Sequence, residues 1–188
     1  MESINLKTDM IMKKLLGIVA LLAVAVFATN DVLAQEVKSM KIDEVMTDGE
    51  QYVGKVITVE GLCTHICSHG GRKMFLRGKN GLLRVQSSKE TGAFSADVVN
   101  EPVQVTGTLC ETRIDETYLK NWEDRIKNGN KVGEHGGCET EAAARGDKGN
   151  TDQQKIDNFR KRIAERNAAE GKNYLSVFYM NAQSYKIL

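Results

Sequence analysis

Five short runs of apolar residues, many of them β-branched, predict β-strands along this chain. They are residues 53–65, 73–77, 82–86, 102–110 and 174–180. Gly, Asn and Pro punctuate the intervals between the runs, as expected where a chain turns from one strand to the next. Asn80-Gly81, in particular, is typical of a tight hairpin and joins the second run to the third.

A helical spacing of apolar residues replaces the strand pattern elsewhere. Short helices are predicted at residues 40–46 and 92–99, and longer ones at residues 115–128 and 151–170. Asp115 and Thr151 are suited to cap the first turns of the longer helices, and Gly129 and Gly171 are suited to end them. The charged residues along 155–172 predict a solvated helix face.

Residues 1–34 predict a secretory signal peptide. Lys13 and Lys14 precede an apolar run at residues 15–27, and Val32-Leu33-Ala34 places small or apolar residues at the cleavage positions. The run is shorter than the roughly 20 residues that span a membrane, although an uncleaved anchor is the alternative. We therefore expect cleavage after Ala34, export to the periplasm or the cell exterior, and no membrane span in the remainder.

Residues 35–188 are then expected to form one domain. Three strands in a meander, a short helix and two further strands are the order of the oligonucleotide/oligosaccharide-binding (OB) fold, a five-stranded Greek-key barrel. Residues 115–172 insert two helices between the fourth and fifth strands. The prediction is a mainly β protein of the β+α class, an OB-fold barrel with a two-helix insertion.

The Cys and His residues concentrate in two short clusters. Residues 63–71 read Cys-Thr-His-Ile-Cys-Ser-His-Gly-Gly, and residues 135–138 read His-Gly-Gly-Cys. Along a regular strand Cys63 and His65 would share one face, the face of the preceding Ile57 and Val59. A bulge at Gly61 would instead turn the Cys/His series outward, away from the core.

Both clusters fall in loops where OB folds bind ligands, the loop after the first strand and the connection before the last. We predict that they form one site for a zinc or copper ion, since both ions accept thiolate and imidazole ligands. The candidate ligands are Cys63, His65, Cys67, His69, His135 and Cys138. Because residues four apart on a strand are separated by about 13 Å, the strand is expected to end near His65, with Cys67 and His69 on the turn.

Disulfide bonds are the alternative fate of these cysteines in an exported chain. If the first and fourth strands pair, Cys63 could lie across from Cys110, and Cys67 could form a second bond with Cys138. Thiol-redox chemistry is a third possibility, which the absence of a Cys-x-x-Cys motif disfavours.

Several of these motifs resemble those of an uncharacterised family of small exported bacterial proteins with an OB-fold barrel. The resemblance is carried by Val53 to Gly61, by the C-x-H-x-C-x-H-G-G motif at residues 63–71, by Gly92-Ala93-Phe94 and by Arg113-Ile114-Asp115. It implies the fold and the exported location, and supplies no activity, cofactor or site residue.

Charge and motif content narrow the function. A formal net charge of +1 at pH 7 disfavours dedicated nucleic-acid binding, which needs clustered Lys and Arg. The sequence has no phosphate-binding Gly-rich loop, nucleophile elbow or zinc-protease motif. We therefore expect a non-enzymatic binding module that holds zinc or copper. The alternative is a disulfide-stapled module for a peptide, an oligosaccharide or a partner protein, and the ligand or partner itself stays unknown.

Overall fold

The computed structural model describes residues 37–67, 70–79, 81–129 and 149–188, which belong to one compact unit, Val37–Leu188. Its strands are β1 (Lys38–Lys41), β2 (Val56–Ile66), β3 (Lys73–Arg77), β4 (Leu82–Gln86), β5 (Pro102–Ile114) and β6 (Leu175–Ile187). Its helices are α2 (Ile42–Asp48), α3 (Glu116–Lys127) and α5 (Asp152–Glu170), with 3₁₀ turns η1 (Gly49–Tyr52) and η2 (Ala96–Val98). The predicted signal peptide, residues 1–34, lies outside the described residues and stays a prediction.

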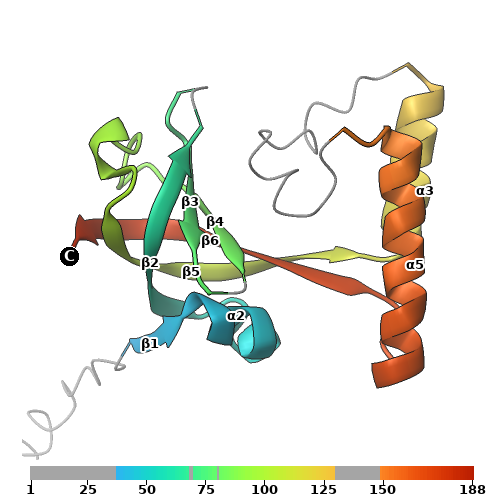
Figure 1. Ribbon diagram of the computed structural model, residues 1–188, viewed down its shortest axis with the longest axis horizontal. Coiled ribbons are helices and arrows are strands. Elements are labelled where there is room, and N and C mark those ends of the chain that lie inside the picture. Colours follow the sequence, from blue (N-terminus) through green and yellow to red (C-terminus); the bar gives the residue numbers. More distant parts are fainter. Residues whose placement is uncertain (1–36, 68–69, 80, 130–148) are drawn as a thin grey trace, which may run out of the picture. The chain divides into compact units, whose positions relative to one another are not determined.

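Five of the strands close into a barrel (Figure 1). Their order is β2-β3-β4-β6-β5, and β2 pairs with β5 to complete the ring. The β4–β6 pairing is parallel, and the other pairings of the ring are antiparallel. β1 adds a short parallel strand beside β2. This topology confirms the predicted OB-fold barrel and its β+α class.

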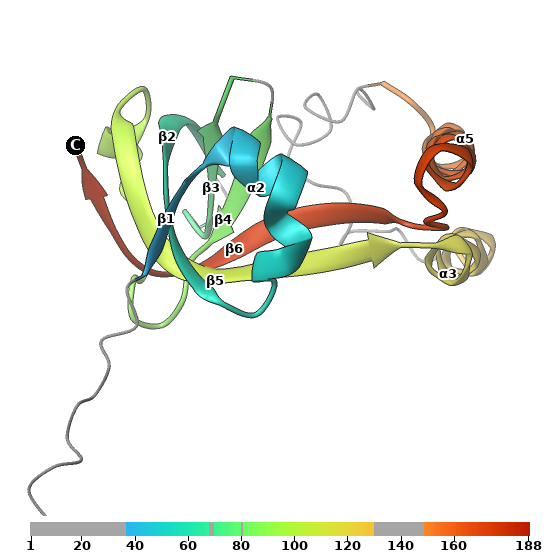
Figure 2. The ribbon, with the colours of Figure 1, turned by 90° about the horizontal axis from the view of Figure 1, so that it is seen from below.

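The two-helix insertion is also confirmed, because α3 and α5 lie between β5 and β6 in the sequence. Both strands continue beyond the barrel as a two-stranded ribbon, in which residues 109–114 pair with residues 175–180. The helix pair lies at the far end of this ribbon (Figure 2). None of the helices in the described part of the chain is long and apolar enough to cross a membrane.

Buried apolar residues form two separate clusters. The barrel core takes inward-facing residues from all five strands, together with Ile42 and Val45 of α2. A second cluster surrounds Leu119 and Trp122 of α3 and packs them against α5. The ribbon therefore joins two cores that are each buried by their own elements.

The ends of the long helices agree with the sequence prediction. The Asp115 side chain accepts a hydrogen bond from the Tyr118 backbone N–H at 2.8 Å at the start of α3. Thr151 and Gln154 form a reciprocal capping box at the start of α5. Gly171 ends α5 with φ of 68°, a left-handed conformation that glycine adopts without steric cost.

Besides shifts of a few residues at element ends, such as the continuation of β5 to Ile114 beyond its predicted end at residue 110, three elements differ from the prediction. The helix expected at residues 92–99 is only the 3₁₀ turn η2, because the chain is already extended again at Val99, the residue that follows η2. β1 was not predicted, since its one buried side chain, Met40, gives no periodicity. β6 continues to Ile187, well past the predicted end at residue 180, because backbone pairing with β5 extends it through polar residues.

Candidate functional site

A β-bulge in β2 separates the first Cys of the motif from the first His. Cys63 pairs with Leu76 of β3, whereas His65 pairs with Phe75, so Thr64 is the extra residue of the bulge. Cys63 is 0% exposed in the barrel core. The ring of His65 lies on the other face, 5.7 Å from that of Phe75. The prediction that Cys63 and His65 share one face is therefore wrong.

Gly61 itself is regular, and the bulge considered there as an alternative is absent. Glu60 and Leu62, its two neighbours, keep their register with β5. A Cβ at position 61 would collide with the Ile42 side chain of α2, which packs directly over the glycine. Gly61 thus permits the close approach of α2 to the barrel and does not change the register of β2.

Cys67 lies on the turn after β2, as predicted from the distance between residues four apart on a strand. Its backbone N–H donates to the Lys73 carbonyl at 2.9 Å, and its carbonyl accepts from the Gly71 N–H at 3.1 Å. The other three candidate ligands, His69, His135 and Cys138, lie outside the described residues. Within the part of the chain that the structure describes, no three Cys, His, Asp or Glu side chains gather as a metal site would require.

The alternative of a Cys63–Cys110 disulfide is wrong. Both residues are free thiols, and so is Cys67. β2 and β5 do pair, but the Cys63 backbone N–H donates to the Glu101 carbonyl, whereas Cys110 lies opposite Tyr179 of β6. Residues 101 and 110 are roughly 25 to 30 Å apart along an extended chain, and bridged Cα atoms must lie within about 7 Å. The Cys67–Cys138 alternative involves a residue outside those described.

Five residues form a continuous row across the outer face of the barrel. They are cross-strand neighbours in the order His65 (β2), Phe75 (β3), Arg84 (β4), Tyr179 (β6) and Cys110 (β5). Each lies next in sequence to residues that face the barrel core, so strand alternation turns the row outward. We refer to these five residues as the outer row.

Arg84 and Tyr179 are in direct contact within the outer row. The guanidinium carbon of Arg84 lies 5.0 Å from the centre of the Tyr179 ring. Burial and the neighbouring Cys110 thiol raise the pKa of Tyr179, so its phenol stays neutral at neutral pH. The Tyr179 ring therefore attracts the Arg84 cation through its π face and fixes the orientation of the guanidinium.

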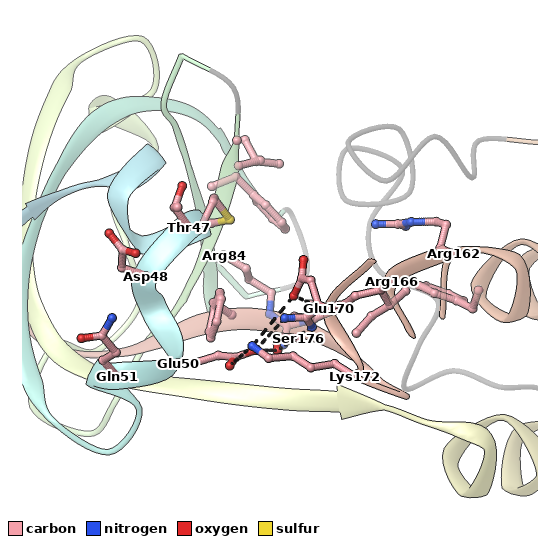
Figure 3. A pocket seen from close by; sticks show the side chains of 18 residues that line it. Thr47, Asp48, Glu50, Gln51, Arg84, Arg162, Arg166, Glu170, Lys172 and Ser176 are labelled. Carbon is pink, nitrogen blue, oxygen red and sulfur yellow. Dashed lines mark hydrogen bonds and ion pairs between the residues drawn. The ribbon is translucent and has the colours of Figure 1, made fainter. Parts of the chain in front are cut away.

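A cavity of about 840 Å³ lies between the barrel and α5. Its walls are formed by α2 and η1, by β3 and β4, by the start of β6, and by one face of α5 (Figure 3). The apolar part of the lining consists of Met46, Phe75, Leu82, Phe159, Leu175, Val177 and Phe178. This volume is within the range of small-molecule sites, about 300 to 1,000 Å³. Apolar walls with a few charged groups are also typical of such sites.

Glu50 of η1 is the centre of an ion-pair cluster beside the cavity (Figure 3). Its carboxylate accepts hydrogen bonds from Lys172 at 2.6 Å, Arg166 at 2.8 Å and Ser176 at 2.9 Å. The bonds from Lys172 and Arg166 lower the pKa of Glu50 to about 2. Arg166 also pairs with Glu170 at 3.0 Å. The charges of Arg166 and Lys172 are thus balanced by Glu50 and Glu170.

Arg162 and Arg84 are the cations of the cavity lining that do not belong to the Glu50 cluster. Arg162 is exposed on α5, and its guanidinium carbon lies 5.8 Å from the centre of the Phe159 ring. Figure 3 shows its side chain extending from α5 towards the cavity. Arg84 reaches the cavity from the barrel. Basic groups therefore approach the same space from two elements.

This site was not predicted, because the charged residues along 155–172 were interpreted as a solvated helix face. That prediction is wrong for Arg160, which bridges Glu116 at 2.8 Å and Glu123 at 2.7 Å on α3. It is also wrong for Arg166, which pairs with Glu50. One signal was present in the sequence: Phe159, Arg162 and Arg166 are spaced so that they share one helix face.

No protein-family model matches this chain, and no curated protein matches it. Similar solved structures include a protein assigned as an aspartyl-tRNA synthetase from Leishmania major Friedlin, with TM-score 0.31 and 14% identity over 45% of this chain and 18% of that chain. Another is an aspartyl-tRNA synthetase from Entamoeba histolytica, with TM-score 0.33 and 13% identity over 45% of this chain and 19% of that chain. The chain thus spans less than a fifth of either relative. TM-scores this low do not establish a shared fold. The fold assignment therefore rests on strand order and register.

Proposed function

We propose that this chain is an exported, non-enzymatic binding module that takes its ligand in the cavity between the barrel and α5. The observation that carries the proposal is the position of the cavity. Phe75 and Arg84 contribute to its walls from the outer faces of β3 and β4, the second and third strands of the barrel. In OB folds this face, together with the connection between the last two strands, is where ligands bind. The step from position to function is an analogy with other proteins of the fold.

The chemistry of the lining favours binding over catalysis. A general acid or base works best with a pKa near the operating pH. Glu50 has a pKa of about 2 and is held by three hydrogen bonds, so it stays ionised and fixed at neutral pH. The remaining lining combines apolar side chains with cations, a combination suited to holding a ligand in one orientation.

Chemical-shift mapping would test the proposed site. The probe is N-phenyl-1-naphthylamine, a neutral apolar molecule, titrated into the isotopically labelled chain. The methyl groups expected to shift are those of Leu82, Leu175 and Val177, which line the cavity. Matched exposed methyl groups outside it are those of Val56, Leu62 and Ile187. Shifts confined to the cavity set would support the proposal, and shifts confined to the exposed set, or none at all, would overturn it.

A zinc or copper site at the Cys/His clusters is a second proposal. The observation that favours it is Cys67, a free thiol on the turn that leads directly to His69. Cys63 is left out of the proposed ligand set, because it faces the core and burial raises the pKa of its thiol. A thiol that stays protonated is a poor metal ligand and a poor nucleophile.

Metal analysis with free-thiol titration would test this second proposal on protein prepared without a purification tag. About one equivalent of zinc or copper is expected, as in a mononuclear Cys/His site. Cys67→Ser should lose the metal, while the matched variant Cys110→Ser should keep it. Absence of metal together with loss of the Cys67 and Cys138 thiols would contradict the proposal and support a disulfide between them.

A further inference from the structure

We infer that the ligand of this cavity is an organic anion, a small molecule with one acidic group on an apolar body. The inference rests on the proposed binding function and adds the chemistry of the ligand. It starts from the balance of charges around the cavity. Arg166 and Lys172 are neutralised by Glu50 and Glu170, so they offer a ligand little positive charge.

Arg162 is the group that distinguishes an anion from a neutral ligand. Among the described residues it contacts the ring of Phe159 and forms no ion pair. It lies between Phe159 and Arg166 in sequence, on the face of α5 that lines the cavity. An Arg side chain in this position can donate two parallel hydrogen bonds to a carboxylate, sulfonate or phosphate.

Arg84 adds positive potential from the barrel side. Its guanidinium group is stacked on Tyr179, and this stacking restricts the planes in which its N–H groups can point. Arg162 and Arg84 belong to different elements, α5 and β4, so an acidic group within the cavity would be attracted from both walls. Asp48 is the acid of the lining outside the Glu50 cluster, and Figure 3 shows it at the opposite end of the lining from Arg162.

The apolar walls indicate what the acidic group is attached to. Met46, Leu82 and Val177 form apolar surface on the barrel side, and Phe159 forms it on α5. A volume of about 840 Å³ is far larger than a single inorganic anion needs. Burial of an apolar body against these side chains would contribute about 25 cal/mol per Å² removed from water.

Two fluorescent probes that differ in one group test the inference. 8-Anilino-1-naphthalenesulfonate is N-phenyl-1-naphthylamine with an added sulfonate, so the pair isolates the effect of the negative charge. We expect the sulfonate to bind the wild-type chain more tightly than the neutral probe. Arg162→Gln should weaken sulfonate binding about tenfold or more, the effect of losing one charge-assisted hydrogen bond, and leave the neutral probe unchanged.

Lys161→Gln is the matched control. It removes the same charge one residue away, from a side chain that does not line the cavity. It should leave the binding of both probes unchanged. A double variant, Ile187→Ser with Leu188→Ser, removes exposed apolar side chains elsewhere on the barrel and should also have no effect.

Equal affinity of the wild-type chain for the two probes, or an equal loss of both in Arg162→Gln, would overturn the inference and leave cavity binding intact. Sulfonate binding that disappears in the Ile187/Leu188 variant would overturn it as well. Failure of both probes to bind would overturn the proposed function itself.

Discussion

Gly61 and Gly107 end two similar runs of sequence, Ile57-Thr58-Val59-Glu60-Gly61 and Val103-Gln104-Val105-Thr106-Gly107. Their neighbours in the fold are of different kinds. Gly61 lies under the flexible end of the Ile42 side chain. Gly107 lies at a register shift between β5 and β6, where an added Cβ would be 2.9 Å from the Cα of Ala182 and would also meet the Asn181 carbonyl. The closest approach is thus made by a side chain at Gly61, where the Arg77 carbonyl oxygen lies 3.1 Å from the added Cβ, and by the backbone at Gly107.

This difference predicts unequal costs for the same substitution. Gly107→Ala should lower the free energy of unfolding by about 2 to 3 kcal/mol, because a paired strand cannot move aside. Gly61→Ala should cost about 1 kcal/mol, since the end of a side chain can rotate away. Urea unfolding of the two variants would measure both values. Equal costs would contradict the contrast between side chain and backbone contacts.

The Cys/His motif shows how one residue limits prediction from sequence. The alternate positions of Cys63, His65 and Cys67 suggested that they share one face of β2. The only sign of a bulge in the sequence was Gly61. The extra residue is Thr64, and its position is set by the pairing of β2 with β3, which the sequence of β2 alone does not specify. A shift of one residue moves every following side chain to the other face. Cys63 therefore faces the core, while His65 joins the outer row.

At the level of elements, sequence prediction succeeded where the signals are local. β3 and β4 were predicted residue for residue, because turn residues bound both of their short apolar runs in the sequence. α3 and α5 begin at the predicted caps, α5 ends at the predicted Gly171, and the C-cap of α3 is Asn128, one residue before the predicted Gly129. β1 and the last residues of β6 were missed, because their main support is hydrogen bonding to a neighbouring strand and their side chains are mostly exposed.

The capping box of α5 provides a test at this level. Thr151→Ala removes the side chain that accepts the Gln154 backbone N–H at 3.2 Å. It should destabilise the helix by about 1 kcal/mol. Amide hydrogen exchange should accelerate in the first turn of α5, and urea unfolding should report the loss of stability.

Gln153→Ala is the control for this experiment. It removes an exposed hydrogen bond to Asp157 one turn away and one to Glu123 of α3, and should cost only about 0.5 kcal/mol. Similar losses in the two variants would show that the capping box contributes no more than a surface pair.

For the whole molecule, the decisive feature is the contact between the barrel and the helical insertion. The two hydrophobic clusters are separate, and the β5–β6 ribbon and the Glu50 cluster connect them. Glu50 comes from η1, next to the barrel, whereas Arg166 and Lys172 come from α5 and the segment that follows it. The cavity exists because these distant segments meet, and no local sequence pattern reports such a meeting. This is why the fold could be predicted from the sequence and the cavity could not.

The Glu50 cluster should couple the stability of the two parts to pH. Glu50→Gln should lower the free energy of unfolding by about 1 to 2 kcal/mol at pH 7, since it removes a charge that accepts bonds from two cations. The folded-state pKa of Glu50, about 2, lies below its ordinary value of 4.5. Its stabilisation is therefore complete above pH 4.5 and is lost as the pH falls from 4.5 to 2.

Urea unfolding of the wild type and Glu50→Gln should give stabilities that converge over this range, while Glu165→Gln, an exposed change on α5, should match the wild type throughout. A difference between Glu50→Gln and the wild type that persists at pH 2 would mean that something other than the carboxylate charge holds the insertion to the barrel.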